Sequence, residues 1–157
     1  MDKQKIITEL EEKFKKIKEK LKFNANLDDL DRAFSIRDIV IKDGFVSEDL
    51  SKQIRYRIIE VYMGWNDYLH SLIMPNPQNI LNISESKVLS AEQKREITEL
   101  MKKIMEISSG NAIINFTRDN QVESKLIDEA LEFWENDFKK NLLIVLKKIN
   151  EEWARVK

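Results

Sequence analysis

The 157-residue chain contains no cysteine, one histidine, three glycines and two prolines. The absence of cysteine excludes disulfide scaffolds, thiolate metal sites, iron–sulfur clusters and cysteine nucleophiles. A single histidine excludes the standard ferritin-like di-iron site, which needs two Glu-x-x-His pairs on different helices. The glycines, Gly44, Gly64 and Gly110, stand too far apart to form a phosphate-binding loop. So few glycines and prolines leave few natural breaks, which favours long helices.

Long apolar segments are absent as well. The longest uncharged run, residues 68–84, contains both prolines and several amide side chains, so it is too polar and too broken to span a bilayer. The N-terminus lacks the apolar region of a secretory signal. We therefore expect a cytoplasmic protein that does not contact membranes. A net charge of −1 with 35% charged residues indicates a surface of mixed sign, not one dedicated to polyanions.

Apolar residues recur at helical spacing along most of the chain, and no segment shows the alternation of a strand. We predict helices over residues 2–23, 27–43, 47–74, 90–108 and from 120 to near the C-terminus, with a short helix at 111–118 and a loop over 76–88. The predicted capping residues are Asn26, Ser47, Ser90 with Gln93, and Asn120 with Glu123, while Gly44 and Gly110 end helices.

This pattern predicts an all-α fold, an elongated antiparallel bundle of five to six helices, in a single domain over residues 1–157. In the first helix Ile7, Leu10, Phe14, Ile17 and Leu21 form a narrow apolar seam. In the last helix the apolar residues recur at close to 3.7 residues, the period of a straight helix. A chain of this length buries a core of ordinary size without a metal or disulfide, and we expect no cofactor.

Residues 55–77 hold all three tyrosines, the only histidine and both prolines. Asp67 and His70 share a helix face, but Glu60 lies ten residues from His70, about 15 Å along the axis, so these groups cannot hold one ion. We interpret His70 as a surface residue near a helix C-terminus. Gly64 predicts a tight helix crossing. Aromatic side chains are enriched at interface hot spots, and the candidate binding patch is Tyr56, Tyr62, Trp65, Tyr68 and His70.

No convergent catalytic set is visible, so the leading hypothesis is a non-enzymatic interaction or assembly protein with a protein partner, either a homodimer or a subunit of a larger assembly. One alternative is a carboxylate-bound divalent-metal enzyme using Glu96-x-x-Glu99 or Glu129-x-x-Glu132-x-x-Glu135. However, we place Asp128, Glu132 and Glu135 on a solvated face. A third hypothesis is a nucleic-acid-associated factor that uses the lysine-rich part of the first helix, residues 13–22, although we expect no such binding.

Overall fold

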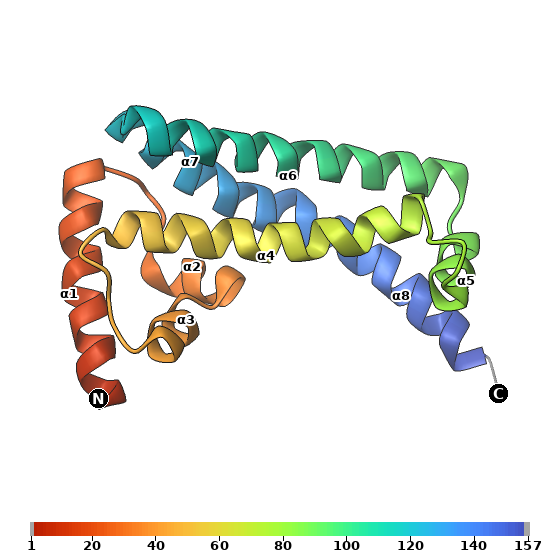
Figure 1. Cartoon of the computed structure of the whole chain (residues 1–157), viewed down its shortest axis with the longest axis horizontal. Helices are drawn as coiled ribbons and strands as arrows, with labels where there is room; N and C mark the ends of the chain where they lie inside the picture. Colours follow the sequence, from red (N-terminus) through yellow and green to blue (C-terminus); the bar gives the residue numbers. More distant parts are fainter. Residues whose placement is uncertain (1, 156–157) are drawn as a thin grey trace.

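The computed structural model describes residues 2–155, which form helices joined by short connections, with no strand in that range (Figure 1). The all-α class is therefore confirmed. Helices α4 and α6 run side by side, α1 crosses one end of α4, and α5 and α8 meet at the other. No helix among the described residues is long and apolar enough to cross a membrane. The elements are α1 (Lys3–Leu21), α2 (Leu27–Phe34), α3 (Ile36–Asp43), α4 (Leu50–Ile73), α5 (Ile80–Val88), α6 (Ala91–Thr117), α7 (Asn120–Phe133), the π-helical turn η1 (Trp134–Phe138) and α8 (Lys139–Arg155).

Helix α1 follows the predicted seam with one shift, because Ile6 is buried while Ile7 is only half-buried. The segment predicted as one helix over 27–43 is instead two, α2 and α3, separated by Ser35 in the left-handed conformation. In one straight helix, Phe34 and Ile36 would point about 200° apart. The break at Ser35 lets both side chains enter the core, where each is fully enclosed.

Helix α4 ends close to the predicted residue but begins two residues later than a Ser47 cap would give, because Asp49 caps it, while the Ser47 hydroxyl accepts from the Asp49 amide. The predicted crossing at Gly64 is wrong, since Gly64 is exposed and a Cβ there would meet no atom within 4 Å. The loop predicted over 76–88 is partly helical: the Asn79 side chain accepts from the amides of the first turn and starts α5.

The predicted capping box of Ser90 and Gln93 is present and starts α6. Gly110 does not end this helix, which continues to Thr117, so the separate short helix predicted at 111–118 is part of α6. A Cβ on Gly110 would approach the Leu126 side chain of α7 to 3.2 Å. The glycine thus permits a close approach of two helices, which is the role the sequence suggested for Gly64.

Helices α7 and α8 form the predicted long C-terminal helix, which is interrupted by the π-helical turn η1. The turn lies in the aromatic part of the core, where the rings of Trp134 and Phe138 stack with centroids 5.3 Å apart. The Tyr62 ring packs 5.5 Å from that of Phe138, and its hydroxyl donates to the Ala130 carbonyl at 2.5 Å. Most of the buried apolar side chains form one connected cluster.

Candidate functional site

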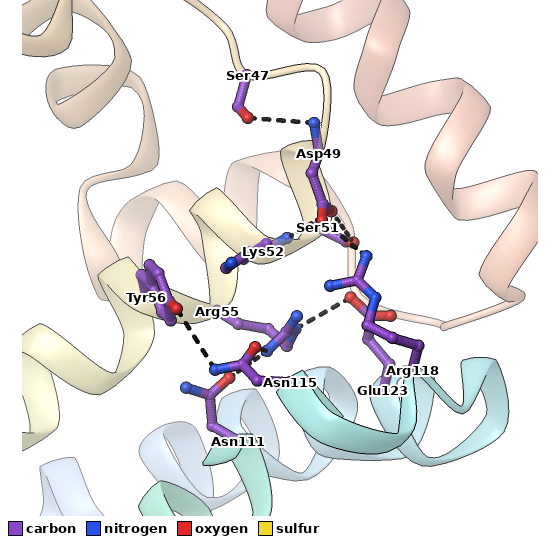
Figure 2. A network of polar contacts seen from close by, with 10 residues as sticks. All are labelled: Ser47, Asp49, Ser51, Lys52, Arg55, Tyr56, Asn111, Asn115, Arg118 and Glu123. Atoms are coloured by element: carbon purple, nitrogen blue, oxygen red, sulfur yellow. Dashed lines mark hydrogen bonds and ion pairs between the residues drawn. The ribbon is translucent and has the colours of Figure 1, made fainter. Parts of the chain in front are cut away.

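The most unusual feature of the interior is a charged residue, Arg55, whose side chain is fully enclosed between α4, α6 and α7 (Figure 2). Its Nε donates to the Glu123 carboxylate at 3.0 Å, and Glu123 is itself buried. Its Nη1 donates to the side-chain oxygens of Asn111, in a short hydrogen bond, and of Asn115 at 3.1 Å. Nη2 has no acceptor within residues 2–155. One buried arginine therefore ties three helices together.

The same network reaches the surface through Asn115. Its side-chain amide donates to the Tyr56 hydroxyl at 3.4 Å, while its oxygen accepts from Arg55 (Figure 2). The Tyr56 ring is about half exposed and lies beneath the Lys52 ammonium, 5.4 Å from the ring centroid. A surface aromatic is thereby held by a hydrogen bond from within and a cation–π contact from outside.

A second ion pair lies beside the buried network. Arg118, the left-handed residue that follows α6, donates to the Asp49 carboxylate at 2.7 Å. Burial alone would raise the pKa of the Asp49 carboxyl. The Arg118 guanidinium and the Lys52 backbone amide outweigh that effect and hold the pKa below its ordinary value. The pKa of Arg118 is raised by the same contact, so both groups stay charged near neutral pH.

The two ion pairs border an open cleft of about 350 Å³ between the C-terminal end of α1 and the first turns of α4 and α7. Its charged lining consists of Lys20, Glu48, Asp49, Arg118 and Glu123. All three acids are already paired with cations, Asp49 and Glu123 with arginines and Glu48 with Lys13. The two arginine pairs join α4 to α7 and the start of α4 to the end of α6.

Sequence reasoning missed this network, although a signal exists for part of it. On α4, Arg55 follows the buried Ser51 by four residues and precedes the buried Ile58 by three, so it lies on the inward stripe. Glu123 likewise stands four residues before the buried Ile127. Its expected role was to close a capping box with Asn120, but the side chain of Asp119 caps α7 and Glu123 turns inward. A charged residue on an apolar stripe indicates a buried partner, but not which one.

The structure does not bring the five residues of the candidate binding patch onto one surface. Tyr62 is fully enclosed, Trp65 and Tyr68 are partly buried, and Tyr56 and His70 are exposed. Burial raises the pKa of Tyr62 above the ordinary tyrosine value. Because Tyr62 belongs to the core, it cannot contribute to a surface patch. Tyr56 is the only aromatic of the five that is exposed.

Tyr68 belongs to a different cluster, where α4, α5 and α8 meet. Its hydroxyl donates to the Glu85 carboxylate at 3.3 Å, and the other Glu85 oxygen accepts from the Trp153 indole at 2.9 Å. The Trp65 ring packs edge-on against Tyr68. Burial, and next the Glu85 charge, raise the pKa of Tyr68 to about 12. This cluster joins the ends of three helices.

The structure also shows where the residues of the metal-enzyme and nucleic-acid hypotheses lie. No three Asp, Glu or His side chains among the described residues are arranged to hold one metal ion. Asp128, expected on a solvated face, instead accepts from the backbone amides of Asn24 and Ala25 and fixes the turn after α1. Glu132 and Glu135 are exposed as expected. On α1, Lys13 pairs with Glu9 and Glu48.

A surface that the sequence analysis did not single out lies on the second half of α6. Residues 107–117 contain no charged side chain, in a chain that is 35% charged. Phe116 is 91% exposed, the most exposed large apolar side chain in the described part of the chain, and Ile113 is 57% exposed. On the neighbouring α4, the exposed Tyr56 accepts a hydrogen bond from Asn115 of the same turns of α6. We call this surface the α6 face; its members are Ser109, Ala112, Ile113 and Phe116 of α6 with Tyr56 of α4.

No protein-family model matches the chain, and no curated protein and no solved structure is significantly similar to it.

Proposed function

We propose that this elongated antiparallel helical bundle is a non-enzymatic interaction or assembly protein, and that the α6 face is its contact surface. The observation that carries the proposal is the exposure of Phe116, at 91%, within eleven residues that lack any charge. Interface cores are depleted of charged residues and enriched in aromatic ones. The first half of α6 does not share this character, because it carries charges up to Glu106.

The surroundings of the α6 face support the same reading. Asn111 and Ile114, which alternate with its members along α6, are buried, so the helix presents one side to the core and the other outward. Tyr56 is held in place by Asn115 and by the Lys52 cation. Side chains that are ordered before binding lose less conformational freedom when a partner arrives, and this favours affinity.

The contact surface can be tested by site-specific photo-crosslinking in the cells that produce the protein. A photoreactive phenylalanine analogue replaces Phe116 in one variant and Phe45 in a matched control. Phe45 is also an exposed phenylalanine, but it lies on the α3–α4 connection and not on α6. We expect a discrete crosslinked product at position 116 and none at position 45.

The crosslinking experiment can also contradict the proposal. If illumination yields no adduct at position 116, or the same pattern of adducts at both positions, then the α6 face is not a specific contact surface. Because Phe116 is almost fully exposed, the analogue leaves the core unchanged. Circular dichroism of the variant therefore serves as the folding control.

A further inference from the structure

We propose that the α6 face binds a second copy of this chain, with the two α6 helices crossing in antiparallel directions about a twofold axis. This inference rests on the proposed function and names its partner. A twofold contact uses the same patch on both copies, so the patch must be complementary to itself. Both the charge and the shape of α6 meet that condition.

The charge pattern favours the antiparallel arrangement. All charged residues of α6 lie between its start and Glu106, and residues 107–117 carry none. A parallel pair would lay the charged half of α6 against its own copy, with each charge near one of the same sign, which costs binding energy. An antiparallel crossing centred on the uncharged half brings only uncharged residues of α6 together.

The shape of the face is also self-complementary. The exposed side chains are small at Ser109 and Ala112, and large at Ile113 and Phe116. A twofold axis that passes between Ala112 and Ile113 places Phe116 of each copy opposite Ser109 of the other. A large apolar side chain then fills the space above a small one twice in the same contact, and small residues let two helices approach closely.

The available area predicts a weak dimer. Fully buried aromatic side chains contribute about 150–250 Å² each. At their observed exposures, Phe116 and Tyr56 together offer roughly 210–350 Å² per copy. A standard interface buries about 800 Å² per partner. The remaining members of the face add less than these two rings, so we expect dissociation constants in the micromolar range.

Sedimentation velocity of the purified chain, from roughly 1 µM to 1 mM, tests self-association. We expect a reversible monomer–dimer equilibrium. The variant Phe116→Ser removes the central anchor and should raise the dissociation constant at least about thirtyfold. The matched control Phe45→Ser should leave it unchanged. A chain that stays monomeric at the highest concentration, or a dimer that Phe116→Ser does not weaken, overturns the proposal.

The orientation is testable because the chain has no cysteine, so a single introduced thiol can react only with its counterpart in another copy. In the proposed pair, two Ala112→Cys thiols lie near the axis, within one interhelical distance of about 8–10 Å. Two Glu99→Cys thiols would be about 40 Å apart along the helices. A short bismaleimide linker should therefore join the first variant and not the second. Equal crosslinking of both indicates a parallel pair and overturns the antiparallel contact.

The two proposals fail in distinguishable ways. A chain that is monomeric in solution, yet yields an adduct with a different protein from position 116 in cells, retains the proposed function and loses the second copy as partner. An adduct of twice the mass of the chain supports both proposals. The absence of any adduct and of any dimer overturns both.

Discussion

The variant Glu123→Ala tests how much the stability of the fold depends on the carboxylate that pairs with the buried Arg55. In Glu123→Ala, Arg55 keeps its positive charge with no exposed surface and retains only the two asparagine oxygens. Breaking a buried ion pair from one side costs about 3–5 kcal/mol, because the remaining charge is left uncompensated. Domains have a total stability of about 5–15 kcal/mol. We therefore expect this one substitution to remove a large share of the free energy of unfolding.

Removing Arg55 instead of Glu123 should lower the free energy of unfolding by less. In Arg55→Met the orphaned charge is the Glu123 carboxylate, which is buried but lines the open cleft, so a shift of its side chain toward the cleft restores its hydration. In the double variant Arg55→Met/Glu123→Leu no unpaired charge remains. Its cost should fall to about 1–3 kcal/mol, the penalty for leaving the buried Asn111 side chain without its partner. The double variant should thus be more stable than Glu123→Ala.

Urea unfolding followed by circular dichroism and tryptophan fluorescence measures these free energies. With the single variant Glu123→Leu added, the two single variants Arg55→Met and Glu123→Leu, their double variant and the wild type form a double-substitution cycle, which isolates the coupling between the two residues. A cost below about 1 kcal/mol for Glu123→Ala, together with additive effects in the cycle, would refute the reasoning. Such a result would mean that Arg55 relaxes toward solvent once its partner is lost.

Three further outcomes are expected. Gly64→Ala should stabilise the chain by about 1 kcal/mol, because alanine is the better helix former and the added methyl meets open space. Gly110→Ala should stabilise it less, because its methyl meets a packed leucine, and urea unfolding compares the two variants. Asp49→Asn keeps a capping side chain but loses the charge facing Arg118. Because folding lowers the pKa of Asp49, the wild type should be more stable than this variant near neutral pH, and thermal melts should show that the advantage disappears as pH falls below about 4. Tyr68, with its pKa raised to about 12, should make the chain lose stability between about pH 10 and 12, as the unfolded state ionises first, and Tyr68→Phe should make that slope shallower, with the remainder due to Tyr62, whose pKa burial also raises.

Much of the fold follows from local sequence patterns. The all-α class, most of the extent of α4 and the start of α6 at Ser90 rest on periodicity and capping, which act within a few residues. The errors arose where tertiary packing overrides local preference. Gly110 remains helical because Ile107, Asn111 and Ile114 on either side of it are all buried, and Ser35 takes the left-handed conformation because two neighbouring apolar residues both enter the core.

The candidate site was harder to predict than the fold. Arg55 and Glu123 are 68 residues apart, and nothing local to either residue identifies the other. The concentration of aromatics in residues 55–77 drew attention to one helix, but those side chains divide between the core, the α5–α8 end and the surface. Phe116 was assigned to a short helix of its own. Its exposure becomes apparent only once residues 111–117 are seen to continue α6 with Ile114 inward.

The buried network and the α6 face are two sides of the same turns of one helix. Asn111 and Asn115 point toward Arg55, while Ala112 and Phe116, each one residue further along, point outward. Neighbouring residues on a helix are separated by about 100° of rotation. If α6 rolled by that amount, Phe116 would turn from solvent toward its neighbours and the asparagines would leave the arginine. The hydrogen bonds from Arg55 to Asn111 and Asn115 therefore favour the observed rotation of α6. That rotation decides which residues of α6 face outward.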